Sequence, residues 1–510
     1  MTALQFSALL VCAIVLSLAL DVFALPRTSL RRSGEAVMLH AATVLFLICI
    51  AFLATKRPFF STIVAVSIVG LTVAVSNAKY ESLREPFVFS DLSLFSQLFS
   101  HPRLYLPFLS VGKVLLIAIG VLLLGAGHWI EMPLASAYGL ATGFAAVACM
   151  ILGRWLAGRM VLTLVPEVDQ RNLGFFSVFV AYLLNGMRLQ TLRSFRRVVA
   201  AGPYSGGEPL VAHPDVIMIQ SESFFDVRHI SPAIMPTVLT NYDRVREESV
   251  YHGELEVPAW GANTMRTEFS VLTGIPSAKL GYARFYPYAF VRRKCASLAS
   301  WFERNDYDTI GMHPYYGSFF GRKRVFPLMG FGRLIDIADF DSAPLAGPYI
   351  SDAAVVEKII SVLDAPRSSP LFIFAMTMEN HGPLHLESVE LGESRRYHEL
   401  GEGKEWRDLT AYLRHVANAD AMLGRLIEFL RARQRETIVC FYGDHVPALP
   451  RVFDRIGATP ERSHYLIWRN SGTKGASRQD VRAESLGAMV FGAMQPDEFS
   501  ATTLSMTTRQ

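Results

Sequence analysis

Five long apolar segments in the first 152 residues constrain this chain more than any other feature. None of them contains an acidic residue, and together they contain a single lysine, Lys113. A helix needs about 20 apolar residues to cross the hydrocarbon core of a bilayer, and each segment approaches or exceeds that length. The segments are Leu4–Leu20, Ala36–Ala54, Phe59–Asn77, Pro107–Gly127 and Ala135–Leu152. We therefore predict a five-span α-helical membrane domain over residues 1–165.

The first segment could also be a cleaved signal peptide. Its N-terminus, Met1-Thr2-Ala3, carries no basic side chain, and no Ala-x-Ala-like site follows the apolar run. Signal peptides typically have both a basic N-terminal region and such a cleavage site, so we interpret this segment, which has neither, as a retained helix.

Charge alone does not settle the orientation of these spans. Lys56 and Arg57 favour a cytoplasmic N-terminus, whereas Arg27, Arg31 and Arg32 in the first loop weigh against it, because basic residues concentrate on the cytoplasmic side. Residues 78–105, between the third and fourth spans, are predicted either as short amphipathic helices at the interface or as a solvated loop.

The remaining chain divides into a connection and a large soluble domain. Phe175–Leu184 is apolar but too short to span a bilayer, so we predict an interfacial helix and a linker over residues 166–208. Residues 209–510 are numerous enough for one large core.

Composition excludes two classes of protein. The net charge of +4 is too small to indicate nucleic-acid binding. Three of the five cysteines, Cys12, Cys49 and Cys149, lie in apolar segments, which leaves Cys295 and Cys440 and no pattern of a disulfide framework.

In residues 209–510, apolar β-branched runs alternate with longer helical patterns. This arrangement predicts an α/β domain with a mainly parallel central sheet. Four of these runs end in polar residues that could bind a ligand or take part in catalysis. These residues are Glu222, His313, the Glu379–His381 segment, and Asp444 with His445. Ligands of open α/β sheets bind outside the carboxyl ends of the strands, so we expect these side chains to share one edge.

Asp444 and His445 offer a carboxylate and an imidazole to one cation, and Glu222 adds a second carboxylate. Alone, the Asp-His pair is more typical of a helix cap beside a surface histidine. With Glu222 and His381 at equivalent strand ends, and Thr264 as a fourth ligand, it predicts a site for one divalent metal, Mn²⁺, Mg²⁺ or Zn²⁺.

Thr264 follows Gly261 in a polar turn before the apolar segment that begins at Phe269. Taken alone, a threonine in this position is most often a helix N-cap, a role that Asn263 could also take. Beside a metal, its hydroxyl could instead be a phosphate nucleophile.

Three further side chains are candidates for substrate contacts. His381, in the loop Asn380-His381-Gly382, is predicted to be an acid or base on the substrate side. His313 and Arg322 could bind phosphate oxygens, although each alone is more often structural.

These motifs, in this order, resemble the lipoteichoic acid synthase and phosphoglycerol transferase branch of the alkaline phosphatase superfamily. The matching segments are Ser221-Glu222-Ser223, Thr264-Met265-Arg266-Thr267-Glu268-Phe269, His313 with Ser318–Arg322, Asn380-His381 and Gly443-Asp444-His445. The predicted five-span N-terminal membrane domain also resembles that of the family.

The resemblance implies a sulfatase-like fold and one metal, Mn²⁺ by preference, bound by Glu222, Thr264, Asp444 and His445, with Thr264 as nucleophile. It also implies that His313, Arg322 and His381 contact glycerol phosphate, taken from phosphatidylglycerol and passed to an envelope glycan. The chain would be a multi-pass protein of the bacterial inner (plasma) membrane, with its catalytic domain outside the cytoplasm.

The sequence departs from the family pattern in three places. The family often has Thr-Ser-Asp-Ser-Glu-Phe where this chain has Thr264-Met265-Arg266-Thr267-Glu268-Phe269, a tryptophan where Phe320 stands, and an acid where Tyr315 stands. These differences affect the acceptor and the headgroup, and leave the metal ligands and the nucleophile unchanged.

Three alternatives remain open. A sulfatase would share the fold, but its nucleophile lies in a Cys/Ser-x-Pro-x-Arg motif that Thr264-Met265-Arg266 does not match. A phosphoethanolamine transferase also has five spans and a threonine nucleophile, and differs in the sequence around that threonine. A membrane scaffold with an inactive domain would not be expected to retain all of the predicted metal ligands.

Overall fold

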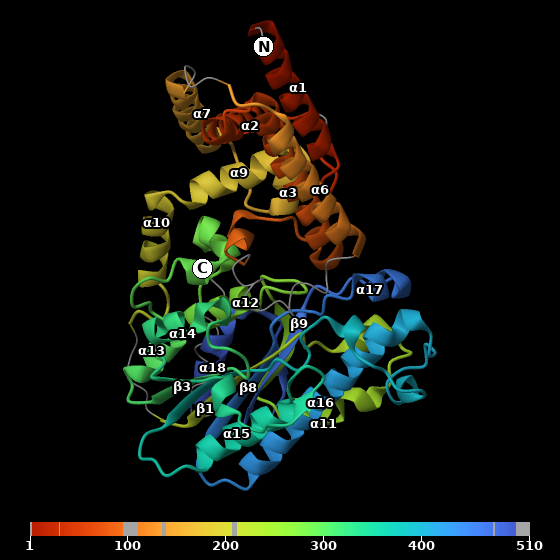
Figure 1. Ribbon diagram of the computed structural model, residues 1–510. Helices are drawn as coiled ribbons and strands as arrows, with labels where there is room; N and C mark the ends of the chain where they lie inside the picture. Colours follow the sequence, from red (N-terminus) through yellow and green to blue (C-terminus); the bar gives the residue numbers. More distant parts are fainter. Residues whose placement is uncertain are drawn as a thin grey trace. The chain divides into compact units, whose positions relative to one another are not determined.

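The computed structural model describes residues 3–29, 31–94, 111–134, 139–206, 212–472 and 475–495. The chain divides into two compact units, Met1–Leu192 and Arg193–Gln510 (Figure 1). The predicted boundaries at residues 165 and 208 remain predictions.

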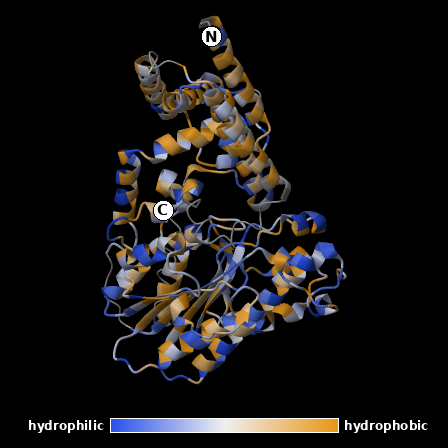
Figure 2. Cartoon of the chain, viewed as in Figure 1, coloured by the Kyte–Doolittle hydropathy of each residue, from blue (hydrophilic) through white to orange (hydrophobic). Residues whose placement is uncertain are grey.

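The first unit is helical. Its helices are α1 (Ala3–Val22), α2 (Gly34–Thr55), α3 (Pro58–Leu83), α6 (Val111–Ile130), α7 (Gly139–Arg159), α8 (Pro166–Leu173) and α9 (Phe175–Gly186), and α10 (Leu189–Ala200) crosses into the second unit. Within the described residues, α1, α2, α3 and α7 are long and apolar enough to cross a membrane. Figure 2 shows the apolar character of these helices.

These four helices correspond to four of the five predicted spans. The other, Pro107–Gly127, begins at residues 107–110, which lie outside the described residues, and continues as α6. A count of five therefore remains a prediction. Between α3 and α6, Phe89–Leu94 forms a short 3₁₀ helix, and residues 95–105 of the predicted interfacial segment lie outside the described residues.

α9 contains the short apolar segment that we predicted to lie at the interface. Phe175, Phe176 and Phe179 are buried in the same core as residues of α2, α3 and α7. A buried carboxylate connects the start of α9 to α1, because Asp21 accepts a hydrogen bond of 2.8 Å from the Phe176 amide and pairs with Arg32. α9 is thus an integral part of the first unit.

The second unit is an α/β domain. Its strands are β1 (Asp215–Ser221), β2 (Tyr251–Glu256), β3 (Asp308–Met312), β4 (Arg333–Ile335), β5 (Leu345–Ala346), β6 (Tyr349–Ile350), β7 (Leu371–Met376), β8 (Thr437–Gly443), β9 (Ser463–Arg469), β10 (Ser477–Arg478) and β11 (Val481–Arg482). Its helices are α11 (Thr240–Glu247), α12 (Thr264–Thr273), α13 (Leu298–Glu303), α14 (Arg322–Val325), α15 (Asp352–Asp364), α16 (Arg407–Arg431), α17 (Pro450–Ile456) and α18 (Leu486–Met494).

The main sheet has the order β10-β2-β9-β8-β1-β7-β3-β4, with β11 also paired to β2. The strands from β8 to β4 run parallel, whereas β9 is antiparallel to both of its neighbours, β8 and β2. The prediction of a mainly parallel sheet is confirmed. β8, β1 and β7 are buried along their whole lengths, as expected of parallel strands covered on both faces.

Helices cover both faces of this sheet. On one face, Ile373 of β7 belongs to a core shared with α11, α15 and α16. Side chains alternate along a strand, so the neighbouring Phe372 points to the other face, where it stacks on Phe302 of α13 at 4.4 Å between ring centroids. Because the faces are filled with apolar side chains, polar chemistry is concentrated at the strand ends.

Candidate active site

The four strands with polar ends are adjacent in the sheet, in the order β8-β1-β7-β3. Their register keeps these ends level: Ser221 pairs with Gly443, and Gln220 pairs with both Met376 and Tyr442. Glu222 and Asp444 each follow one member of the Ser221–Gly443 pair, so two carboxylates leave neighbouring strands side by side. The predicted convergence at one sheet edge is confirmed by the strand order.

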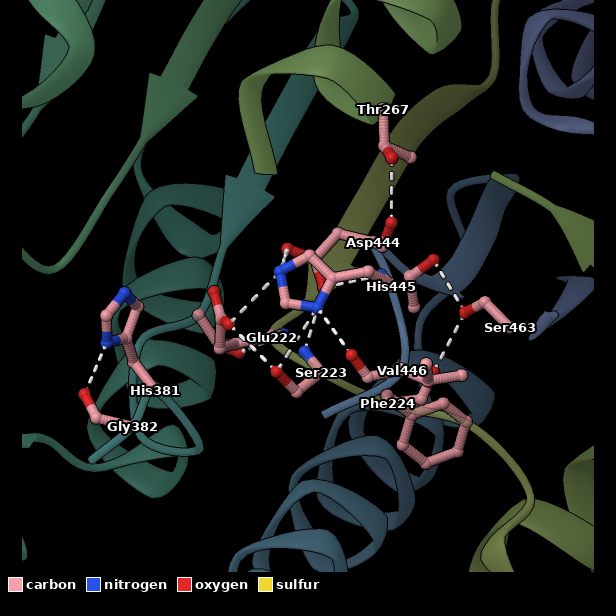
Figure 3. Close-up of polar contacts among 12 residues, drawn as sticks. Glu222, Ser223, Phe224, Thr267, His381, Gly382, Asp444, His445, Val446 and Ser463 are labelled. Carbon is pink, nitrogen blue, oxygen red and sulfur yellow. Dashed lines mark hydrogen bonds and ion pairs between the residues drawn. The ribbon is translucent and has the colours of Figure 1, made fainter. Parts of the chain in front are cut away.

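Glu222, Asp444 and His445 form a buried cluster in which one ligand atom of each residue lies within 4.8 Å of the others. His445 Nε2 is 3.3 Å from Asp444 Oδ2 and 3.7 Å from Glu222 Oε1. All three side chains are almost inaccessible to solvent. Figure 3 shows them turned toward one another.

The hydrogen bonds of this cluster fix its orientation. His445 Nδ1 lies 2.9 Å from the carbonyl oxygen of Val446 and therefore carries the proton, which leaves the lone pair on Nε2. Among the described residues, neither Nε2 nor Asp444 Oδ2 has a hydrogen-bond partner, although both are buried. Two such acceptors facing each other fit a shared cation, which would replace the missing donors.

The charges in this cluster also favour a bound cation. Burial and the neighbouring Asp444 carboxylate raise the pKa of Glu222 to about 8. When both are ionised, two carboxylates this close and this deeply buried repel each other. A divalent ion would relieve that repulsion.

Ser223 connects the two carboxylates and was not predicted as a functional residue. Its amide donates to Asp444 Oδ1 at 2.8 Å, and its hydroxyl donates to Glu222 Oε1 at 3.0 Å. To make both contacts it adopts a left-handed conformation, with φ of 55°, which is uncommon for residues other than glycine. Its own carbonyl oxygen accepts a 2.7 Å hydrogen bond from Tyr412.

The close approach of β8 to the segment after β1 requires a glycine at position 443. A Cβ on Gly443 would collide with the carbonyl oxygen of Phe224 and with Oγ of Ser463.

We expect Gly443→Ala to lower the free energy of unfolding by about 1–3 kcal/mol, because the backbone must move to make room. Denaturant unfolding of the full chain measures this. Gly475→Ala is the control, because a Cβ there meets no atom of the described residues within 4 Å, and an equal loss in both variants would contradict the steric explanation.

Thr264 is the first residue of α12, and two hydrogen bonds hold the start of this helix on the segment Asp444-His445-Val446. The Gly261 amide donates to the carbonyl oxygen of Val446 at 3.1 Å, and Thr267 Oγ1 donates to the carbonyl oxygen of Asp444 at 2.7 Å. These contacts lie three residues before and three residues after Thr264. The turn between them is compact because both Gly261 and Asn263 are left-handed, with φ of 67° and 68°.

The cap interpretation of this turn receives no support from its geometry. Asn263 occupies the N-cap position but makes no capping hydrogen bond with its side chain, and Thr264 is already inside the helix. The half-buried Thr264 side chain thus belongs to a helix start held against the segment that carries Asp444 and His445. Helix starts of this kind also favour anions.

Arg322 and His313 are brought together, with Arg322 Nη1 3.4 Å from His313 Nε2, and both are buried. The Nε and Nη2 edge of the guanidinium binds Glu268, whose carboxylate accepts from Nε at 3.0 Å and from Nη2 at 2.7 Å. Glu268 also accepts a hydrogen bond from Tyr288. Only the Nη1 side of Arg322 is therefore oriented toward His313, which narrows the part of the guanidinium that could bind phosphate.

His381 lies in the loop after β7. Its Nδ1 is 2.7 Å from the carbonyl oxygen of Gly382, so Nδ1 carries the proton and Nε2 keeps a lone pair (Figure 3). Burial lowers the pKa of His381 below its ordinary value, which keeps the ring neutral at pH 7. Tyr349 approaches the same loop, with its hydroxyl donating to the Gly382 carbonyl at 3.2 Å.

Four contributors to this site were missed by reading the sequence: Ser223, Thr267, Glu268 and the Val446 carbonyl. Thr267 and Glu268 lie inside the recognised Thr264–Phe269 motif, but their partners are 177 and 54 residues away. No local pattern identifies such partners.

Comparison with known proteins identifies the family. The sulfatase family model matches residues 214–496, which is just over half of the chain. The capsular polysaccharide biosynthesis protein RkpI of Rhizobium meliloti (strain 1021) is 26% identical to it, over 93% of this chain and 90% of that protein. A putative cyclic beta-1,2-glucan modification protein of the same strain is 29% identical over 50% of this chain and 39% of its own length.

Among solved structures, the integral membrane protein lipooligosaccharide phosphoethanolamine transferase A (EptA) of Neisseria meningitidis covers 94% of this chain and 95% of its own. The sequence identity is 13% and the TM-score is 0.54, which shows a common fold of apolar helices followed by a sulfatase-like domain. By this family match, which covers the domain with the mainly parallel sheet, the chain belongs to the sulfatase family.

Proposed function

We propose that the protein is a membrane-anchored phosphoglycerol transferase, which moves glycerol phosphate from phosphatidylglycerol to an envelope glycan through a covalent Thr264 intermediate. The observation that carries the proposal is the position of the α12 start. Hydrogen bonds on both sides of Thr264 hold it on the segment that bears Asp444 and His445.

Glu222, Asp444 and His445, with the Thr264 hydroxyl, would hold one divalent metal, Mn²⁺ by preference and Mg²⁺ or Zn²⁺ as alternatives. The buried acceptors Asp444 Oδ2 and His445 Nε2, both without hydrogen-bond partners among the described residues, support this donor set. A metal bound there would lower the pKa of the threonine hydroxyl and balance charge on a phosphoryl oxygen.

In the first half-reaction, Thr264 Oγ forms a bond to the phosphorus of the donor lipid, and the bond from phosphorus to the diacylglycerol oxygen breaks. The threonine proton leaves on diacylglycerol, which stays in the bilayer, and glycerol phosphate remains esterified to Thr264. The Nη1 side of Arg322, with His313, contacts the phosphoryl oxygens.

In the second half-reaction, an acceptor hydroxyl attacks the same phosphorus. His381 Nε2, which keeps a lone pair because Nδ1 donates to the Gly382 carbonyl, takes the acceptor proton and passes it to the departing Thr264 oxygen. Both Thr264 and His381 return to their starting protonation states, so the cycle is balanced.

The acceptor class is supported by the names of two relatives, one in capsular polysaccharide biosynthesis and one in modification of a cyclic glucan. For the donor, the phosphoethanolamine transferase with the same fold supports a second candidate, phosphatidylethanolamine. The two candidates share the nucleophile, the metal site and the leaving group, and differ only in the headgroup transferred.

An assay with purified full-length protein, Mn²⁺ and two labelled lipids separates these donors. We expect diacylglycerol to be released from phosphatidylglycerol, and label to appear on Thr264 in the absence of acceptor. Release from phosphatidylethanolamine alone would replace the donor and keep the mechanism, whereas release from neither lipid would reject a lipid-dependent transferase.

The proposal also sets the arrangement in the membrane. A lipid donor and an exported glycan acceptor require catalysis outside the cytoplasm, so five spans over residues 1–165 give a cytoplasmic N-terminus and a periplasmic or extracellular domain from about residue 209. A reporter fused after Gln510 should be active outside the cytoplasm, and activity restricted to the cytoplasm would contradict both the span count and the compartment.

A further inference from the structure

The loop that carries His381 is held at both ends by one buried histidine of α16. His415 Nδ1 lies 2.8 Å from Glu379 Oε1, and Glu379 stands two residues before His381. His415 Nε2 lies 2.8 Å from Glu387 Oε2, six residues after His381. The histidine is fully buried, so no water competes for either ring nitrogen.

This geometry requires a positively charged ring. A neutral imidazole has one N–H and cannot donate to two carboxylates, yet both ring nitrogens of His415 face carboxylate oxygens at hydrogen-bond distance. Burial alone would lower the pKa of His415, but hydrogen bonds to Glu379 and Glu387 outweigh it and raise the pKa to about 9. The ring is therefore an imidazolium at neutral pH.

The two carboxylates are themselves anchored. Glu379 Oε2 accepts the amide of Asp352 at 2.6 Å, at the start of α15, and Asn418 of α16 donates to Glu379 Oε1. Glu387 accepts from Arg414 at 2.8 Å. The loop can therefore be displaced only by breaking contacts to α15 and α16, both of which pack in the core on that face of the sheet.

The other charged groups around His415 determine how strongly the position of the loop depends on the His415 proton. Asp352 lies close enough to Glu379 for burial and that carboxylate to raise its pKa well above the ordinary value, so Asp352 adds little negative charge. Arg414, with Glu393 as its second partner, balances Glu387 from the other side. If His415 loses its proton, either Glu379 or Glu387 loses its hydrogen bond from the ring. That end of the loop is then held by fewer contacts, which are those of the Asp352 amide and Asn418 at Glu379, or that of Arg414 at Glu387.

We propose that His415 is a positioning residue, whose doubly donating ring clamps residues 379–387 at both ends and so sets the place of His381 in the site. This inference rests on the proposed function for its effect on turnover, and on geometry alone for its effect on the loop. His415 touches neither His381 nor the metal ligands, so it acts only through the loop.

The sign of the pH dependence follows from the raised pKa. A group whose pKa is higher in the folded state contributes stability that is complete below its ordinary value of 6.5 and is lost as the pH rises through about 9. The clamp should therefore be closed at neutral pH and open progressively toward pH 9.

The test uses the full-length protein and the variant His415→Gln, which can donate to one carboxylate but not to both. A second variant, Glu387→Gln, loosens one end while leaving the histidine and Glu379 in place. The matched control is His398→Gln. His398 is also buried and also bonds α16, through Nε2 at 2.8 Å from Thr410 Oγ1, but it contacts neither end of the loop.

Hydrogen exchange measured by mass spectrometry at pH 7 reports the loop directly and needs no substrate. Peptides covering residues 379–387 should exchange at least about tenfold faster in His415→Gln, faster to a smaller extent in Glu387→Gln, and at the wild-type rate in His398→Gln. Unchanged exchange in both loop variants would overturn the clamp, whichever lipid the enzyme uses.

Turnover reports the positioning role. In His415→Gln we expect kcat to fall about 10- to 100-fold, with KM for the lipid and the bound metal unchanged, because a misplaced base affects the chemical step. The ratio of wild-type to His415→Gln activity should decrease toward 1 as the pH approaches 9, whereas the ratio to His398→Gln stays constant. A loop that exchanges faster with kcat unchanged would overturn the positioning role, and a wild-type protein inactive on both lipids would instead reject the proposed function and leave the exchange result valid.

Discussion

Replacing Thr264 with alanine should reduce diacylglycerol release by at least about a thousandfold, because the proposed covalent route would be lost with its nucleophile. Folding should survive, since Asn263 rather than Thr264 occupies the N-cap position, and even a lost cap costs at most about 2 kcal/mol. Labelled lipid should no longer mark the protein. Lipid turnover, covalent labelling and thermal unfolding together measure these outcomes.

Two variants on the same helix make this result specific. Thr273→Ala removes a hydroxyl whose one hydrogen-bond partner among the described residues is the Phe269 carbonyl of its own helix, so it should keep full activity. Thr264→Ser retains a hydroxyl at the same position and should restore part of the activity. If Thr264→Ala turned over lipid as fast as Thr273→Ala, the nucleophile would have to be another residue, whatever the donor.

Asp444→Asn should lose the bound metal almost completely. The amide keeps the shape of the side chain and an acceptor for the Ser223 amide, but it removes the charge that a divalent ion requires beside Glu222 and His445. Elemental analysis of the purified protein should fall from about one metal ion per chain to near zero, and activity should fall with it.

Asp420→Asn is the matched control for this variant. Asp420 is also buried and also accepts backbone amides, from Asn241 and Tyr242 of α11, but it lies outside the cluster of metal ligands. It should keep its metal even if its stability declines. Equal metal content in Asp444→Asn and in the wild type would remove this site as the place of the metal.

Much of the architecture was predictable from the sequence because its signals are local. Apolar length identified four helices that the structure also shows to be long and apolar enough for a membrane, and β-branched runs identified β1, β3, β7 and β8. The strand-end rule then predicted that Glu222, Asp444 and His445 would meet, because parallel strands in register bring their ends to one edge.

The function of individual side chains depended on partners that are distant in the chain. Arg322 was expected to face phosphate, yet most of its guanidinium is bound to Glu268 on a different helix. Ser223 shares a strand end with Glu222, but its role depends on Asp444, which is 221 residues away. A hydrogen bond between residues so far apart leaves no periodic pattern and no bias of composition in the sequence around either residue, so no short window of sequence can indicate it.

The sequence by itself determined the order of elements, the apolar front, the residue types at the sheet edge and the resemblance to a family, because these follow from short-range patterns. Only the tertiary structure decided which nitrogen of His445 and of His381 keeps a lone pair, how α12 is held beside Asp444 and Val446, and that His415 lies between two carboxylates. Each of these depends on the distance between groups that come together when the chain packs, because protonation and hydrogen bonding respond to neighbours in space.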